Sequence, residues 1–212
     1  MPLGDSITYD TGSLNASYRY ELFRLALQNQ RKIDFVGSRG TGPQIVDGQP
    51  FPRGTEGHPG WTIDDGGGRL GLYPAVAGWL QSTPPDIVTL MIGTNDLDID
   101  FDEANAPVRL GLLLDRIAET TPHALIVLAQ IVPTTDDAAN VAVQAYNAAM
   151  PALVASRVKA GKHVILVDMY EALASHADYK TALMNDKLHP KDAGLVVMAH
   201  TWWAAIGELL PK

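Results

Sequence analysis

The chain has 212 residues, of which 46% are hydrophobic and 19% carry a charged side chain. A domain of this length buries more than half of its surface, so a sizeable hydrophobic core is expected. Sixteen Lys and Arg against twenty-four Asp and Glu give a net charge of −8, which argues against binding nucleic acid through a basic surface. The absence of cysteine excludes disulfides, thiolate nucleophiles and cysteine metal sites. The longer apolar runs, such as residues 124–132, are far shorter than the roughly 20 residues of a membrane span.

Several short apolar segments have the composition of β-strands. They are residues 32–37 (KIDFVG), 86–93 (DIVTLMIG), 123–132 (HALIVLAQIV) and 162–169 (KHVILVDM). Three of them are nearly continuous runs of Val, Ile and Leu, which is typical of parallel strands that are covered on both faces. Residues 1–3 are predicted to be the end of a first strand. Because this piece is short for its role, we expect the natural chain to begin upstream. No basic segment followed by an apolar one opens the chain, so a signal peptide is not expected in this form.

Helical patterns lie between these strands. Ser17 is predicted to cap a helix with apolar residues at helical spacing, and Pro107 suits the first turn of another. Residues 137–160 are predicted to form a long Ala-rich helix that bends at Pro151, and a last helix follows Pro190. The alternation of strands and helices predicts one α/β domain, with a central parallel sheet and right-handed crossovers.

Ligands of open parallel α/β sheets bind beyond the carboxyl ends of the strands, so the loops at those ends are the place to look for chemistry. Three of these loops contain reactive or polar side chains: residues 4–8 (GDSIT), 93–96 (GTND) and 186–190 (DKLHP). Each loop alone is ordinary turn chemistry. Their presence together at one edge of one sheet favours a catalytic site.

Ser6, His189 and Asp186 have the residue types of a nucleophile and its activating partners. A serine hydroxyl is a weak nucleophile until a neighbouring base removes its proton, and histidine is the side chain whose ordinary pKa suits that task near neutrality. Asp186 precedes His189 by three residues and can accept the other ring N–H in a tight loop. The Asn95 amide, the N–H of Ser6 and a glycine N–H from residues 56–61 (EGHPGW) are candidate donors to an oxyanion.

The order of these segments carries a family resemblance. GDSIT, the glycine of GHPGW, GTND and DKLH resemble the four sequence blocks of the SGNH (GDSL-like) hydrolase superfamily. The finer pattern of PLGDSITY, DFVGS, GHPGW and GTNDL most resembles carbohydrate esterase family 3, the acetyl xylan esterases. The resemblance extends from Met1 to the last helix, and it implies a flavodoxin-like three-layer α/β/α sandwich with a central five-stranded parallel sheet.

The resemblance also implies the roles of individual residues. Ser6 matches the nucleophile, His189 the base and Asp186 its acidic partner, while Gly60 and Asn95 match the oxyanion-hole residues beside the N–H of Ser6. Both Gly57 and Gly60 can supply the backbone donor, and Gly60 is favoured because it precedes Trp61 as in the family block.

The function implied by the resemblance is that of a serine esterase. It would remove O-acetyl groups from carbohydrate, with xylan as the substrate class, through an acetyl-enzyme intermediate. We expect no cofactor or metal, an acetylated polysaccharide or a small acetyl ester as substrate, a monomer without nucleic-acid or membrane partners, and an extracellular location. Two alternatives remain open: an SGNH lipase or thioesterase for longer acyl chains, and a catalytically dead flavodoxin-like binding module.

His58 and Trp61 flank the predicted glycine donor. Both can line the acyl or sugar pocket, and Trp61 can equally well serve only to anchor the loop on the core. Asp5 is predicted to brace the loop before Ser6 by accepting backbone N–H groups, without a part in the reaction.

Acidic residues alternate between Asp96 and Asp102, which raises the question of a metal site. A calcium-binding loop requires a glycine at its sixth position and a glutamate at its twelfth. Counted from Asp96, these positions hold Phe101 and Pro107. The segment is therefore predicted to be a solvated acidic loop.

Overall fold

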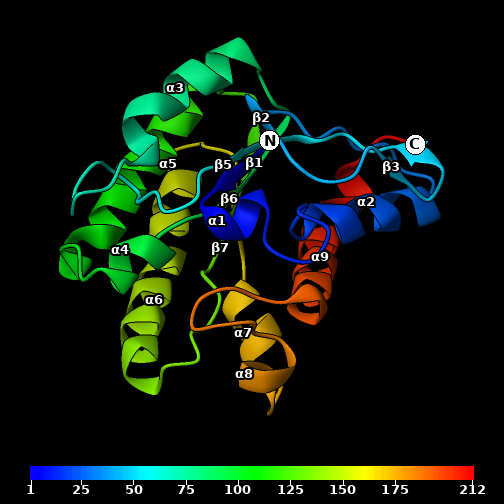
Figure 1. Cartoon of the computed structure of the whole chain (residues 1–212). Coiled ribbons are helices and arrows are strands. Elements are labelled where there is room, and N and C mark those ends of the chain that lie inside the picture. Colours follow the sequence, from blue (N-terminus) through cyan, green and yellow to red (C-terminus); the bar gives the residue numbers. More distant parts are fainter.

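The computed structural model describes all 212 residues and consists of a central six-stranded sheet between two layers of helices (Figure 1). The strands are β1 (Pro2–Gly4), β2 (Arg39–Gly40), β3 (Ile45–Val46), β4 (Gln49–Pro50), β5 (Gly54–Gly57), β6 (Ile87–Met91), β7 (Leu125–Ala129) and β8 (Val164–Val167). The helices are α1 (Ser6–Tyr9), α2 (Arg19–Gln28), α3 (Leu72–Ser82), α4 (Thr94–Asp98), η1 (Glu103–Asn105), α5 (Ala106–Thr120), α6 (Asp137–Lys159), α7 (Met169–Ala174), α8 (Tyr179–Ala182), α9 (Asp192–Ile206) and η2 (Gly207–Leu209).

The order of strands in the sheet is β2-β5-β1-β6-β7-β8. The last five of these are mutually parallel, β2 pairs antiparallel with β5 at the edge, and β3 and β4 form a separate antiparallel pair. Taken in chain order, the parallel strands have the arrangement 2-1-3-4-5 of flavodoxin-like folds. The predicted three-layer sandwich is thus confirmed, with one antiparallel edge strand beyond the predicted five-stranded parallel sheet.

The register of the central strands brings three loops to one edge of the sheet. Gly4, the last residue of β1, lies opposite Gly57 of β5 on one side and Met91 of β6 on the other. The chain therefore leaves these three neighbouring strands at the same level. The strand order reverses between β1 and β6, and such switch points are where ligands bind in this class of sheet.

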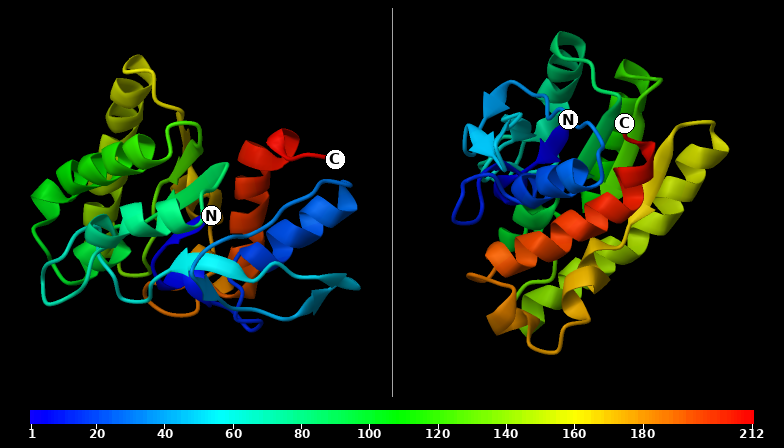
Figure 2. Two further views of the ribbon diagram at one scale, coloured as in Figure 1. Left: turned by 90° about the horizontal axis from the view of Figure 1, so that it is seen from above. Right: turned by 90° about the vertical axis from the view of Figure 1, so that its right-hand side faces the viewer.

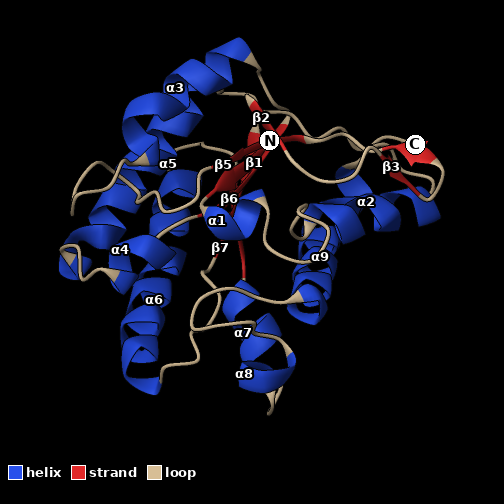
Figure 3. Cartoon of the chain, viewed as in Figure 1, coloured by secondary structure: helices blue, strands red, loops and turns tan.

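Helices α3, α5 and α6 cover one face of the sheet, and α2 and α9 cover the other (Figures 1 and 2). The strands lie between these helical layers (Figure 3). Leu3, Leu90 and Leu128 on adjacent strands are completely buried, as is Trp202 of α9. Burial of each such leucine contributes about 1.5–3 kcal/mol relative to an exposed position. This core holds the sheet edge rigid beneath the loops.

The prediction of a strand at residues 32–37 is wrong. This segment is extended without ladder hydrogen bonds, and the N–H of Lys32 donates instead to Pro211 near the C-terminus, at 2.7 Å. It packs so closely on Gly54 that a Cβ there would lie 2.2 Å from the Phe35 carbonyl oxygen. The position beside β1 is taken by β5, whose sequence GTEG has no apolar side chain to signal a strand.

The four expected helices are confirmed as α2, α5, α6 and α9, but the predicted cap at Ser17 is wrong, and α3 is the longest of the helices that were not expected. The N-cap of α2 is Tyr18, without a side-chain hydrogen bond, because the buried Ser17 hydroxyl donates to the Ile7 carbonyl of α1 instead. The long helix α6 continues through Pro151, and the Asp136 carboxylate caps it by accepting two backbone N–H groups. The unexpected helix α3 buries Leu72, Val76 and Leu80, whose spacing of four is a helical signal.

Candidate active site

Ser6 is held at the turn between β1 and α1. It is the first residue of α1, and Asp5 caps that helix by accepting the N–H of Ile7 at 2.9 Å. The Thr11 hydroxyl donates to the Ser6 carbonyl oxygen at 2.9 Å. These two hydrogen bonds fix the backbone around Ser6. The Ser6 Oγ lies 2.9 Å from Nε2 of His189.

His189 and Asp186 are paired within a closed loop between α8 and α9. The ring Nδ1 lies 3.0 Å from both carboxylate oxygens of Asp186. One of these oxygens also accepts the backbone N–H groups of Leu188 and His189, each at 2.8 Å. The N–H of Asn185 donates to the His189 carbonyl and closes the loop. Ser6, His189 and Asp186 therefore form one hydrogen-bonded line, although Ser6 and His189 are 183 positions apart in the sequence.

The environment of Asp186 keeps it ionised. Partial burial raises the pKa of its carboxyl, but the hydrogen bonds from His189 and Leu188 and the attraction of His189 outweigh burial, so the pKa lies below its ordinary value. The Asp186 side chain is 50% exposed and that of His189 is 32% exposed. A bulky substrate can therefore reach the imidazole without any opening motion.

Gly60 and Asn95 lie on the two loops that follow β5 and β6. Gly60 has a φ of +80°, a left-handed conformation that favours glycine, and its N–H has no acceptor within the protein. The alternative donor Gly57 is engaged, because its N–H donates to the Thr55 hydroxyl at 3.1 Å. The Asn95 amide donates one hydrogen to the Trp61 carbonyl at 2.9 Å, which leaves its other hydrogen free.

Arg69 links the two oxyanion-hole candidates, and sequence reasoning did not find it. Its Nη1 donates to the Gly60 carbonyl and to the Asn95 side-chain oxygen, each at 3.1 Å. The second contact fixes which end of the Asn95 amide faces Trp61, and so the direction of the free N–H. An isolated arginine after a run of glycines has no motif that reveals this role.

Asp96 corrects the expectation of a solvated acidic loop. Its side chain is completely buried, accepts the N–H of Ile63 at 3.0 Å and forms an ion pair with Arg109 at 2.9 Å. Burial raises the pKa of Asp96, and the hydrogen bond from Arg109 opposes that shift. Asp96 thus ties the loop that carries Gly60 to α4. Asp100 and Asp102 are exposed and Asp98 is partly buried. Asp98 pairs with Lys187, and Asp102 pairs with Arg109.

His58 belongs to the same loop as Gly60, directly after β5, and is 6% exposed. Its ring stacks on Trp79 at a centroid distance of 4.3 Å, contacts Trp61 at 4.4 Å and pairs with the buried Glu56 at 2.9 Å. This burial argues against the expected contact between His58 and a substrate. Trp61 is partly buried and packs on the core, which favours its role as a loop anchor.

Asp5 accepts the backbone N–H of Ile7, as predicted for a residue that braces the loop before Ser6. Its second carboxylate oxygen is buried without a hydrogen-bond partner. Burial raises the pKa of Asp5 to about 6, against the lowering effect of the Ile7 hydrogen bond. Asp5 is therefore a buried carboxyl group next to Ser6, with a pKa of about 6.

A small recess lies between α4 and the loop of His189. Its walls include the side chains of Thr94, Leu97, Val132 and Leu188, and its free volume is about 20 Å³. The recess is therefore bordered by residues that adjoin two site residues in the chain, since Thr94 precedes Asn95 and Leu188 precedes His189.

The structure contains no group of three or more His, Asp or Glu side chains arranged to hold a metal ion. None of its helices is both long enough and apolar enough to span a membrane. The chemistry that the arrangement offers comes from its own side chains. A hydroxyl, an imidazole and a carboxylate in line, beside free N–H donors, are suited to acyl transfer.

Comparisons with known proteins agree with this fold. The chain matches the GDSL-like Lipase/Acylhydrolase family over residues 3–195. It is similar to the solved family 3 carbohydrate esterase of Clostridium thermocellum, with 32% identity and a TM-score of 0.82, covering 99% of this chain and 94% of that one. It is 27% identical over 218 residues to a multidomain esterase of Ruminococcus flavefaciens, covering 95% of this chain. It is 32% identical over 144 residues to a putative endoglucanase X of Acetivibrio thermocellus, covering 66% of this chain.

The fold and the site define a hydrolase of the three-layer α/β/α type with a serine, a histidine and an aspartate in line at the switch point of its sheet. The chain belongs to the GDSL-like Lipase/Acylhydrolase family. The matched regions span 60% of the Acetivibrio relative and 27% of the Ruminococcus relative.

Proposed function

We propose that this protein is a serine esterase that removes O-acetyl groups from carbohydrate, with acetylated xylan as the substrate class. In this proposal residues 1–212 form one catalytic domain. The observation that carries it is the 2.9 Å contact between Ser6 Oγ and His189 Nε2, in line with Asp186. The similarity to a family 3 carbohydrate esterase over nearly the whole chain supports the carbohydrate ester as substrate.

The first half of the reaction transfers the acetyl group to Ser6. Nε2 of His189 accepts the hydroxyl proton as Oγ forms a bond to the ester carbonyl carbon, and the carbonyl oxygen becomes an oxyanion. The N–H groups of Ser6 and Gly60 and the free amide hydrogen of Asn95 stabilise that charge. Loss of one such donor typically costs about 10²–10³ in turnover.

Collapse of this intermediate breaks the bond between the carbonyl carbon and the sugar oxygen. His189 returns the proton to that oxygen, so the sugar leaves as an alcohol and Ser6 is acetylated. A water molecule then gives a proton to His189 and attacks the acetyl carbon, and Ser6 leaves with the returned proton as acetate is released. Asp186 orients the imidazole and stabilises its cationic form in both halves. The sequence of steps requires no cofactor.

Arg69 acts in this proposal as a positioning residue. Its guanidinium holds the Asn95 amide and the Gly60 peptide in the orientation that stabilises the oxyanion. Donors that are oriented before the reaction do not have to reorganise as charge develops, which is the source of their catalytic effect.

The recess beside Leu97 and Leu188 supports a short acyl group. Its small free volume, about 20 Å³, supports a short acyl group as the occupant over the chain of an octanoyl ester. This observation favours the acetyl esterase over the alternative lipase or thioesterase. An extracellular place of action is part of the proposal, because a polymer such as xylan is not taken up intact.

The test is to measure acetate released from acetylated xylan and, in parallel, the rates on 4-nitrophenyl acetate and octanoate. We expect acetate release and a preference for the acetyl ester, with the Ser6→Ala variant as the inactive control. Faster hydrolysis of the octanoate favours the lipase alternative. Failure of a serine-directed phosphonate to label Ser6 favours the inactive binding module.

A further inference from the structure

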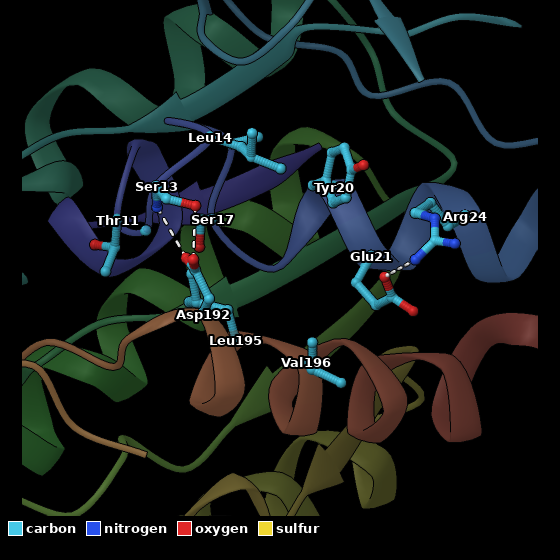
Figure 4. A pocket seen from close by; sticks show the side chains of 12 residues that line it. Thr11, Ser13, Leu14, Ser17, Tyr20, Glu21, Arg24, Asp192, Leu195 and Val196 are labelled. Carbon is cyan, nitrogen blue, oxygen red and sulfur yellow. Dashed lines mark hydrogen bonds and ion pairs between the residues drawn. The ribbon is translucent and has the colours of Figure 1, made fainter. Parts of the chain in front are cut away.

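Two adjacent hollows form a groove on the surface beside the triad. One, of about 250 Å³, lies between the α1–α2 loop, α2 and the start of α9, and the other, of about 440 Å³, continues toward the loop of His189. They share walls formed by residues 11–13 and Asp192. Leu14 and Tyr20 lie on one side of the first hollow and Val196 of α9 on the other (Figure 4). We call these two hollows together the α2–α9 groove.

The α2–α9 groove is attached to the catalytic segments at both of its walls. Thr11 on one wall donates its hydroxyl hydrogen to the Ser6 carbonyl oxygen. Asn185 and Pro190 on the other wall directly precede and follow the segment from Asp186 to His189. The groove is therefore lined by residues that adjoin the catalytic segments in the chain or contact the Ser6 backbone.

The chemistry of ester cleavage places the alcohol on the histidine side of the site. His189 returns its proton to the leaving oxygen, so that oxygen must come within about 3 Å of Nε2. The proposed function assigns the acyl group to the small recess, which is lined by Thr94 and Leu97 of α4. A sugar whose oxygen leaves at His189 thus continues away from the recess, and the α2–α9 groove lies beside the histidine loop.

The lining of the groove combines apolar surface with fixed polar groups. Leu14 is 47% exposed and Val196 is 40% exposed, and the ring of Tyr20 lies near them. Asp192 accepts the N–H of Ser13 at 2.8 Å and its hydroxyl hydrogen at 2.6 Å, so the loop is pinned to the start of α9. These hydrogen bonds lower the pKa of Asp192, which keeps the carboxylate available as an acceptor for hydroxyl groups. Sugar rings have apolar C–H faces and hydroxyl edges that match such a lining.

We propose that the α2–α9 groove binds the sugar residues that neighbour the acetylated one, on the leaving-group side of the ester. The inference rests on the proposed function and deepens it. The groove then selects an oligosaccharide or polymer over a small acetyl ester, while the chemical step uses the same residues for both.

The test compares an acetylated xylo-oligosaccharide with 4-nitrophenyl acetate on groove variants. Val196→Trp fills the groove with a bulky side chain, and Leu14→Ser removes exposed apolar surface from the opposite wall. We expect each to lower kcat/KM for the oligosaccharide about tenfold and to leave 4-nitrophenyl acetate within about twofold. Val158→Trp, at a 53% exposed position near the end of α6, is the matched control and is expected to change neither rate.

A binding measurement covers the case in which a groove variant folds poorly. Unacetylated xylohexaose is titrated into the Ser6→Ala protein with and without Leu14→Ser, and weaker binding with the second substitution supports the groove. Equal losses on both substrates, or unchanged rates on the oligosaccharide, overturn the groove proposal and leave the esterase proposal intact. A native protein that cleaves 4-nitrophenyl acetate but releases no acetate from the oligosaccharide overturns both.

Discussion

The guanidinium of Arg69 donates a hydrogen bond to the side-chain oxygen of Asn95 at 3.1 Å, and the same nitrogen contacts the Gly60 carbonyl. An asparagine amide can be turned over without changing its shape, so only its partners decide which end is the donor. Arg69 on the oxygen and the Trp61 carbonyl on the nitrogen select one orientation. In that orientation one amide hydrogen of Asn95 is free, and we propose that it donates to the developing oxyanion.

Replacement of Arg69 by methionine is expected to lower kcat on 4-nitrophenyl acetate by about 10–10²-fold, with KM nearly unchanged. The contact acts on Asn95 and Gly60, whose donors matter most in the transition state. Steady-state kinetics of R69M, N95A and the double variant check this. The loss caused by R69M is expected to be smaller when Asn95 is already alanine.

The control for this prediction is Arg53→Met, since Arg53 is an exposed arginine outside the site. Arg69→Lys keeps the charge and is expected to restore part of the lost kcat. Fully multiplicative effects of R69M and N95A would show that Arg69 does not act through Asn95.

Ser6→Ala and His189→Ala are each expected to reduce kcat on a short acyl ester by at least about 10³-fold. The two residues act as a unit, so the double variant is expected to be no worse than either single one. Thermal unfolding measured beside the kinetics separates a lost reaction from a lost fold. Substantial activity in a folded variant would be incompatible with the assigned roles.

Asp5→Asn is expected to change how stability depends on pH. In the folded protein burial raises the pKa of Asp5 from 3.8 to about 6, so the folded state binds the proton more tightly than the unfolded state. That stabilisation is complete below pH 4 and is lost as pH rises through 6, by roughly 2–3 kcal/mol. The asparagine keeps the acceptor for Ile7 and cannot ionise.

Urea unfolding of both proteins at pH 4 and pH 6.5 measures this difference. We expect D5N to gain stability relative to the native protein as pH rises. If the difference in free energy of unfolding between the two proteins does not depend on pH, Asp5 has the same pKa in the folded state as in the unfolded chain.

Leu97→Ala is expected to enlarge the recess and to shift acyl preference toward butyrate. One methylene in a hydrophobic pocket is worth about 1–3 kcal/mol, so the ratio of butyrate to acetate kcat/KM is expected to rise about tenfold or more. The substitution costs about 2–3 kcal/mol of stability, because Leu97 is 8% exposed. Leu112→Ala, at a 51% exposed position on α5, is the control. An unchanged ratio would place the acyl group elsewhere.

Most of the central sheet could be predicted from local patterns. Strands β6, β7 and β8 are continuous apolar runs, and a strand buried on both faces must be apolar on both. β5 could not be predicted, because its GTEG sequence becomes a strand only when β1 and β2 pair with it on either side. The alternating segment 32–37 looks like a strand but finds no partner.

The sequence by itself determined the alternation of elements and the chemical types at the strand ends, because both are local properties of spacing and side chain. It singled out Ser6, Asn95 and His189. Only the tertiary structure decided that Gly60 has the free N–H while Gly57 is occupied by Thr55. Only the packed chain reveals Arg69, because its contacts depend on how loops far from one another in the sequence pack at one sheet edge.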